Sequence, residues 1–185
     1  MQQRQRHYSV AEYFAIEQMS DVRHEFLGGA IYGMSGGSRN HNRIALNLSR
    51  MIDSALAGPC ISYVADVRLR TPSGLYTYPD VMVICGHAQL TDEPLDTATD
   101  PFVLVEVLSS STREYDRAGK FDLYRAIPTL RDYLLVDQYS IDVEHRWLVD
   151  ADWRSERRAR REDAFRLNGV AVDIHLSGVY DRVEF

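Results

Sequence analysis

Three charged residues of this chain have the types and surroundings that suit metal-dependent chemistry, and two of them are acids. Asp80 stands at the start of an apolar run and Glu106 stands inside another, residues 102–108. A carboxylate buried in an apolar strand loses its hydration and must gain a partner. A divalent cation between the two acids would serve both, and hard oxygen ligands suit Mg²⁺ or Mn²⁺. The two acids therefore predict a metal site.

The third residue, Lys120, is the one lysine among 21 basic side chains. Lysine carries a compact charge with a tunable pKa, whereas the arginine fork is wide and permanently protonated. On a predicted helix after the second acidic strand, its ammonium could orient or activate a water molecule and stabilise charge developing on phosphorus. The plainer alternative is a helix-surface pair with Asp116, four residues earlier, which stabilises a helix by only about 0.2–0.5 kcal/mol.

The elements that must position these residues follow from capping and periodicity. Ser9 and Glu12 form a capping box that opens a short helix ending near Ser20, and Gly28-Gly29 predicts a tight hairpin. Apolar positions from about His41 to Leu56 recur at helical spacing and predict the longest helix. Alternation over residues 61–69 predicts one half-buried strand.

Residues 81–85, which follow Asp80, and residues 102–108, which contain Glu106, form two almost continuously apolar runs. Such runs are typical of central strands that are covered on both faces. We expect a loop over residues 86–101, a helix over 115–126 and a buried strand over 133–136, so that residues 102–136 form a parallel crossover. Short antiparallel strands follow as far as Ile174. These elements predict one α/β (α+β) domain over residues 1–185, with a mixed central sheet and an antiparallel C-terminal extension.

Composition narrows the classes of function. The net charge of −6 and the pI near 5.5 argue against a tight, nonspecific nucleic-acid binder, so a phosphate substrate would need a local basic patch or metal ions. Cys60 and Cys85 lie in apolar segments and are expected to be small buried side chains, forming neither a disulfide framework nor a zinc site. The polar start predicts no signal peptide or membrane span, which makes the cytoplasm the expected location.

Several stretches together resemble the Uma family of restriction-endonuclease-like proteins, within the PD-(D/E)xK nuclease superfamily. Those stretches are Tyr78-Pro79-Asp80-Val81, Val105 to Thr112, Asp116 with Lys120 and Tyr124, and Arg131 to Asp137. The likeness also includes Glu25, Gly28-Gly29 and His41.

The resemblance implies a restriction-endonuclease-like fold and a Mg²⁺-dependent endonuclease that hydrolyses phosphodiester bonds in nucleic acid, with DNA as the expected substrate. The metal ligands would be Asp80, Glu106 and the Val107 carbonyl, with Glu25 as a supporting acid. Leu108 occupies the position where the superfamily usually has its lysine, and the resemblance places that lysine at Lys120. His41 would contact phosphate or transfer a proton, although a structural histidine at the helix start is an equal alternative.

Other polar clusters have simpler interpretations. Residues 109–112 could suggest a serine nucleophile, but a loop that caps the next helix explains them, with Ser111 or Thr112 as acceptor. The arginines between Arg154 and Arg161 alternate with acids and indicate a solvated hairpin face. Arg113 and Arg117 are better candidates for guiding a nucleic-acid backbone.

A second hypothesis is that the nuclease fold persists as a noncatalytic module that binds nucleic acid or a protein. It is favoured by the acidic net charge and by Leu108 in the usual lysine position. Cleavage of both strands of a duplex commonly needs two active sites, so we also consider a homodimer.

Overall fold

A computed structural model describes residues 6–34, 36–91 and 96–185. Its N-terminal unit consists of helix α1 (Val10–Met19) and the hairpin of β1 (His24–Leu27) and β2 (Ala30–Gly33). The capping box between Ser9 and Glu12 is confirmed. The hairpin turn is also confirmed, because Gly28 and Gly29 both have positive φ (56° and 85°). No helix in the described ranges is long and apolar enough to cross a membrane.

A six-stranded mixed sheet forms the centre of the molecule. Its order is β12-β11-β10-β9-β6-β3, and only β9 and β10 run parallel. The strands are β3 (Cys60–Val64), β6 (Val81–Cys85), β9 (Val103–Leu108), β10 (Asp132–Asp137), β11 (Val143–Val149) and β12 (Asp152–Arg158). The predicted parallel crossover and the fully buried central strands are therefore confirmed.

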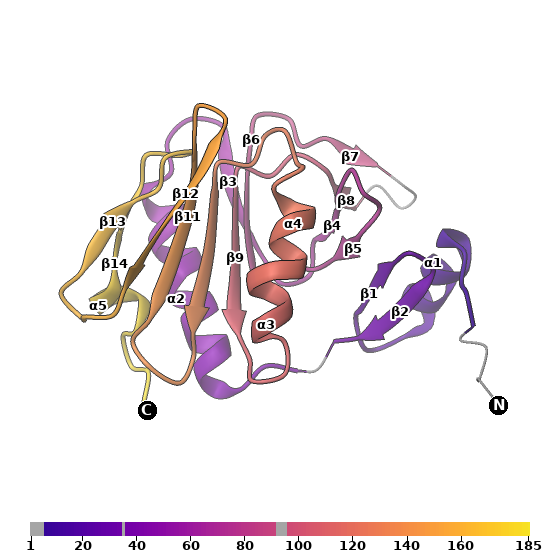
Figure 1. Ribbon diagram of the computed structural model, residues 1–185, viewed down its shortest axis with the longest axis horizontal. Coiled ribbons are helices and arrows are strands. Elements are labelled where there is room, and N and C mark those ends of the chain that lie inside the picture. The colour runs from indigo at the N-terminus through magenta and orange to yellow at the C-terminus, as the bar shows by residue number, and fades with distance from the viewer. Residues whose placement is uncertain (1–5, 35, 92–95) are drawn as a thin grey trace.

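Helices cover both faces of this sheet (Figure 1). Helix α2 (Arg39–Ala55) packs Ile44, Leu48 and Ile52 against the odd-numbered valines of β9. The crossover segment packs on the opposite face, where the even-numbered residues of β9 and β6 point. It consists of α3 (Arg113–Tyr115), the π-helical turn η1 (Asp116–Lys120) and α4 (Phe121–Tyr124). Glu106 therefore points toward the crossover segment.

A second six-stranded sheet, which the sequence did not predict, joins the N-terminal hairpin to the central sheet. Its order is β2-β1-β5-β4-β8-β7. The added strands are β4 (Arg68–Arg70), β5 (Tyr76–Thr77), β7 (Leu90–Thr91) and β8 (Thr97–Ala98).

Two predictions are corrected by this second sheet. The single strand over residues 61–69 is wrong, because Ala65 has a left-handed backbone (φ 56°) that breaks the run, so β3 and β4 join different sheets. The loop over 86–101 contains β7 and β8, while residues 92–95 of it lie outside the described part.

The C-terminal extension is antiparallel, as predicted. Strands β11 and β12 form a hairpin at the edge of the central sheet, and β13 (Ala164–Arg166) pairs with β14 (Asp173–His175) in a small separate sheet. The short helix α5 (Leu176–Val179) follows and packs on α2.

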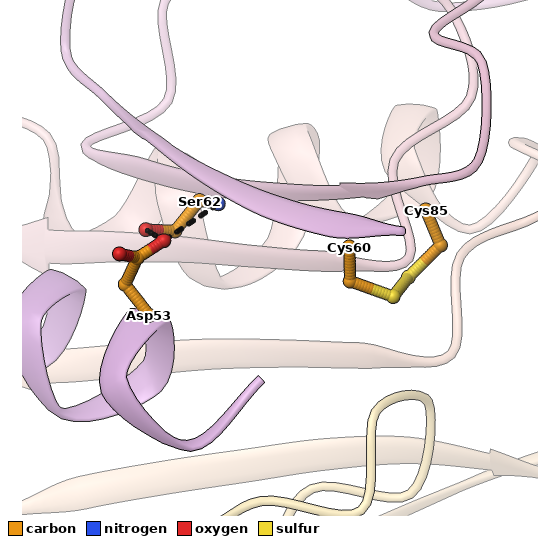
Figure 2. Close-up of a disulfide and its surroundings, with 4 residues drawn as sticks. All are labelled: Asp53, Cys60, Ser62 and Cys85. Carbon is orange, nitrogen blue, oxygen red and sulfur yellow. Dashed lines mark hydrogen bonds between the residues drawn. A yellow bond between two sulfur atoms is a disulfide. The ribbon is translucent and has the colours of Figure 1, made fainter. Parts of the chain in front are cut away.

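The two cysteines correct a further prediction. Antiparallel pairing of β3 with β6 puts Cys60 directly opposite Cys85, with their Cα atoms 3.9 Å apart, and the two side chains form a disulfide (Figure 2). Two separate buried apolar side chains were expected. Strand register, which composition cannot supply, brings the sulfur atoms together. Figure 2 also shows Asp53 of α2 accepting hydrogen bonds from Ser62 of the same edge strand.

Removal of this disulfide should destabilise the oxidised protein. The bridge closes a 25-residue separation, for which restriction of the unfolded chain predicts about 3 kcal/mol. We expect the free energy of unfolding of a Cys60→Ser, Cys85→Ser double variant, measured in denaturant without reductant, to be lower by that order. Reductant should lower the stability of the wild type and leave the variant unchanged. A wild type that is equally stable with and without reductant would show that the bridge does not form.

Candidate active site

The two predicted metal-binding acids lie beside each other on neighbouring strands. Strands β6 and β9 pair antiparallel, with Val81 opposite Val105 and Met82 opposite Leu104. Asp80 comes directly before β6, and Glu106 comes directly after Val105, the last residue of β9 that pairs with β6, so both acids lie where this pairing ends.

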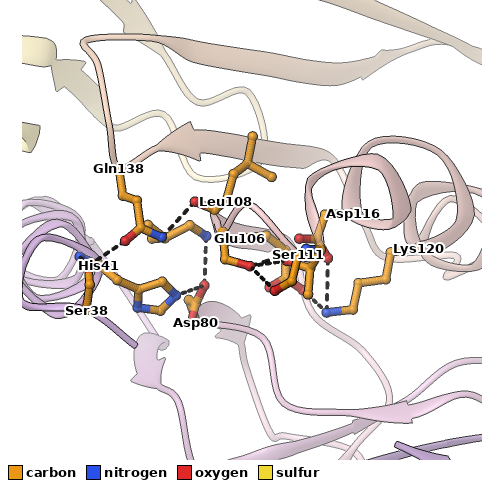
Figure 3. A network of polar contacts seen from close by, with 12 residues as sticks. Ser38, His41, Asp80, Glu106, Leu108, Ser111, Asp116, Lys120 and Gln138 are labelled. Carbon is orange, nitrogen blue, oxygen red and sulfur yellow. Dashed lines mark hydrogen bonds and ion pairs between the residues drawn. The ribbon is translucent and has the colours of Figure 1, made fainter. Parts of the chain in front are cut away.

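Asp80 is held at this point by two contacts. Its Oδ2 accepts the backbone N–H of Val107 at 2.7 Å, and it lies 3.3 Å from Nε2 of His41 (Figure 3). His41 stands in the first turn of α2, so this helix reaches the strand end from the sheet face opposite to Lys120. The Asp80 side chain is 16% exposed, which leaves it open to a solvent-borne ligand.

Glu106 is bound from the other side by the crossover segment. Its Oε1 accepts hydrogen bonds from Lys120 Nζ at 3.1 Å and from the Tyr124 hydroxyl at 2.7 Å. Residues 120 and 124 are one helical turn apart, so both side chains approach the same carboxylate. Oε2 of Glu106 accepts no hydrogen bond from any described residue.

Lys120 is the centre of a buried cluster of acids. Its Nζ lies 2.8 Å from Glu25 Oε1 and 3.5 Å from Asp116 Oδ1, in addition to its bond to Glu106. Glu25 comes from β1, where its Oε1 also accepts the Thr77 hydroxyl. The lysine thus joins the second sheet, the central sheet and the crossover segment at one point.

The π-helical turn helps to place Lys120 and Asp116 in this cluster. Residues 116–120 form this wider turn inside the crossover segment, and both charged residues are buried. Such turns are frequent at functional sites. A Cβ on Gly119 would lie 2.7 Å from the ring of Tyr115, so a glycine is needed at that position.

The cluster fixes the charge of Lys120. Burial alone would lower the pKa of Lys120, but the carboxylates of Glu106, Glu25 and Asp116 outweigh burial and raise this pKa well above its ordinary value. Lys120 is therefore an ammonium at neutral pH. It can donate hydrogen bonds and stabilise negative charge, but it cannot accept a proton from water.

The pKa values of Glu106 and His41 are both raised. Burial, followed by the charges of Asp116 and Asp80, raises the pKa of Glu106 to about 8 against the opposing effect of Lys120. Burial opposes the charged form of His41, yet its hydrogen bond to Asp80 leaves its pKa raised. Because a carboxylate must be deprotonated to bind a metal ion, a cation bound here would displace the proton of Glu106.

Hydrogen bonds outside the charged cluster hold the surrounding segments together. The Ser38 hydroxyl caps α2 by accepting the His41 N–H and donates to Oε1 of Gln138. Nε2 of Gln138 donates to the carbonyl of Leu108 at 2.8 Å. The start of α2, the end of β9 and the residue after β10 are thereby fixed relative to one another, as Figure 3 shows.

The donor set can be tested for its fit to a divalent cation. Among the described residues, no three His, Cys, Asp or Glu side chains have metal-binding spacing. The available set is the Val107 carbonyl and two carboxylates where the pairing of β6 with β9 ends, with Asp80 Oδ1 and Glu106 Oε2 free of hydrogen bonds from the described residues. A few protein oxygens completed by water fit Mg²⁺, which keeps several water ligands.

Every predicted site residue lies at this junction. On one side of the strand end, Asp80 contacts Val107 and His41. On the other side, Lys120 contacts Glu106 and Glu25. Sequence reasoning gave no role to Tyr124 or Gln138 and treated Asp116 as a surface partner of Lys120. The helical spacing of Asp116, Lys120 and Tyr124 was the available signal, because four-residue steps place side chains on one helix face.

The alternative clusters are structural. The predicted cap by Ser111 or Thr112 is wrong, because Thr112 at the start of α3 makes no side-chain cap bond, and the Ser109 hydroxyl accepts the Thr112 N–H at 3.2 Å in the preceding turn. Arg113 pairs with Asp137, while Arg117 lies 3.9 Å from Asp142 and 3.7 Å from Glu144. The arginines between Arg154 and Arg161 belong to edge strand β12 and the turn after it, where Arg157, Arg158 and Arg160 pair with acids.

The raised pKa of Glu106 predicts a pH dependence of stability. Between its ordinary pKa of 4.5 and about 8, folded Glu106 holds a proton that the unfolded chain releases, so stability falls as pH rises across this window. Glu106→Gln cannot titrate, so its free energy of unfolding should fall less steeply with pH. Denaturant titrations without divalent ions, at pH values between about 5 and about 8, measure both slopes. Equal slopes would mean that Glu106 is ionised throughout.

Two proteins of Synechocystis are similar in sequence to this chain. The chain is 40% identical over 148 residues to "Uncharacterized protein sll1609" of Synechocystis, covering 78% of this chain and 84% of that protein. It is 34% identical over 180 residues to "Uncharacterized protein slr1290" of the same organism, covering 96% and 93%.

A solved structure shares the fold. It comes from Anabaena variabilis and is described as "a putative nuclease belonging to DUF820", with a TM-score of 0.73, 13% identity and coverage of 89% of this chain and 93% of that one. The family Uma2, described as "Putative restriction endonuclease", matches residues 10–177. The chain therefore belongs to the Uma2 family and has the fold of its DUF820 structural relative.

Proposed function

We propose that this protein is a Mg²⁺- or Mn²⁺-dependent endonuclease that hydrolyses phosphodiester bonds in DNA. Asp80, Glu106 and the Val107 carbonyl would hold the cation. When bound, such an ion supplies Lewis-acid activation of the phosphoryl group and lowers the pKa of a bound water. Family membership and the nuclease described for the structural relative support the reaction class.

The residues of the chain have distinct roles in this proposal. Lys120, which stays protonated, donates to the developing negative charge on phosphorus and holds Glu106 in place. Tyr124 orients the same carboxylate, and Glu25 and Asp116 fix the ammonium. His41 orients Asp80 and faces the strand end from α2.

One observation carries the proposal. Asp80 and Glu106 both lie where the pairing of β6 with β9 ends, and the sole lysine of the chain bonds to Glu106 from a π-helical turn. A structural ion pair would need only one acid for this lysine, whereas Lys120 lies within 3.5 Å of three acids, Glu25, Glu106 and Asp116.

The proposal is tested by cleavage and by cation binding. Supercoiled plasmid DNA should be nicked or linearised with Mg²⁺ or Mn²⁺ and remain intact with a chelator. Calorimetric titration with Mn²⁺ should show binding that Asp80→Asn weakens. Failure to bind either ion at millimolar concentration, together with failure to cleave, would favour the noncatalytic module instead.

The proposal extends to assembly and location. A homodimer would supply two active sites for the two strands of a duplex, and light scattering in the presence of DNA measures that assembly. A cytoplasmic location would give access to DNA, and there a reducing environment would keep Cys60 and Cys85 as thiols.

A further inference from the structure

A basic cavity lies beside the candidate active site, at the start of α2. It has a volume of about 480 Å³ and is lined by Gly37, Ser38, Arg39, Asn40, Asn42, Arg43, Arg182 and Glu184. We call it the α2 pocket. Three arginines and one glutamate give it a net positive charge, although the chain as a whole carries −6.

The arginines of the α2 pocket are only weakly engaged. Arg43 makes no ion pair with any described residue. Arg39 lies 3.9 Å from Glu184 with both side chains about nine-tenths exposed, and Arg182 meets only its neighbour Asp181, at 3.6 Å. Arg113, by contrast, pairs with the buried carboxylate of Asp137. The guanidinium groups of the α2 pocket are therefore available to bind an anion.

The α2 pocket and the candidate active site share one turn of helix. His41, between Asn40 and Asn42 of the pocket lining, contacts Asp80. A Cβ on Gly37 would lie 2.6 Å from Nδ1 of that histidine, so the pocket wall touches the ring directly. Ser38 also lines the pocket, and its hydroxyl donates a hydrogen bond to Gln138.

A larger cavity on the same helix provides a contrast. It measures about 680 Å³ and includes Arg50, Asp53 and Asp181, so its acids outnumber its single arginine. It lies more than a helical turn further along α2 and includes no residue that contacts Asp80 or Glu106. Of these two cavities, the basic one is the cavity that adjoins the candidate active site.

We infer that the α2 pocket binds a backbone phosphate of the nucleic-acid strand that enters the candidate active site, next to the phosphate that is cleaved. The inference rests on the proposed function and adds a specific contact for the substrate. Arginine suits this task because its planar fork matches phosphate oxygens. Contacts of this kind fix the register of the strand without reading its sequence.

The test measures binding separately from cleavage. A short labelled DNA duplex is titrated with Glu106→Gln protein, in Ca²⁺, at salt concentrations from about 50 to about 200 mM. Arg43→Ala and Arg182→Ala are each added to this background. Each should weaken binding about five- to tenfold near 0.1 M salt. Each should also reduce the slope of log K against log salt concentration by about 1. Arg50→Ala is the matched control, since it removes the same charge from the same helix and should bind as the background does.

The outcomes separate the two claims. If the wild type cleaves DNA but both arginine variants bind as tightly as Arg50→Ala, the α2 pocket does not hold the strand and the nuclease proposal stands. If the wild type neither binds nor cleaves DNA, the proposed function fails as well. A mononucleotide that displaces the duplex at equal phosphate concentration would show a site for free nucleotides and overturn the inference.

Discussion

Glu106→Gln and Asp80→Asn should each reduce divalent-dependent DNA cleavage by on the order of a hundred- to a thousandfold or more. Each replacement keeps the size of the side chain and removes one of the two carboxylates that meet at the β6–β9 opening. Initial rates of plasmid nicking under matched metal concentrations measure the effect. Calorimetry should show weaker Mn²⁺ binding for both variants.

Controls separate this loss from a general loss of structure. Asp122→Asn removes a carboxylate from α4 that is 64% exposed and pairs only with Arg125, so cleavage should be unchanged. Circular dichroism and thermal unfolding should show that the two active-site variants remain folded. A Glu106→Gln or Asp80→Asn protein that cleaves at the wild-type rate would refute the metal assignment.

Lys120→Arg should lower the cleavage rate by about a hundredfold while leaving Mn²⁺ affinity within a few-fold of the wild type. The charge is preserved, but the ammonium occupies a buried position within about 3 Å of two carboxylates, where the wider arginine fork cannot reproduce its contacts. The variant therefore tests whether the role of Lys120 depends on shape as well as on charge.

The reverse exchange at Arg125, at the C-terminal end of α4, is the control. Arg125→Lys changes an exposed partner of Asp122 and should leave both cleavage and stability as they are. Lys120→Met is less informative because it leaves Glu25, Glu106 and Asp116 buried without their cation, which destabilises the fold itself. Full activity in Lys120→Arg would show that Lys120 serves only as a structural ion-pair partner.

Local signals in the sequence predicted much of the architecture. Gly28-Gly29 defined a hairpin because both residues must adopt positive φ. Continuous apolar runs predicted β9 and β10, and the helix between them implied a parallel pair. The acids were identified for the same reason, since a charge inside an apolar strand has few stable explanations.

Features that depend on distant pairing were not predictable. The break at Ala65 needs an alanine in a left-handed conformation, which no residue preference favours. The disulfide requires the register of β3 against β6, and the strands β5, β7 and β8 are two residues long, too short for a periodic signal. The π-helical turn over residues 116–120 also has no signal in the sequence, because the apolar spacing there is that of a regular helix.

The proposed function requires that Asp80 and Glu106 bind one cation together. A crystal soaked in Mn²⁺ tests this directly, because anomalous scattering locates manganese independently of the protein density. We expect a single peak within about 2.0–2.3 Å of a carboxylate oxygen of each acid and of the Val107 carbonyl, with Lys120 still bonded to Glu106. Manganese bound elsewhere, or bound by only one of the two acids, would contradict it.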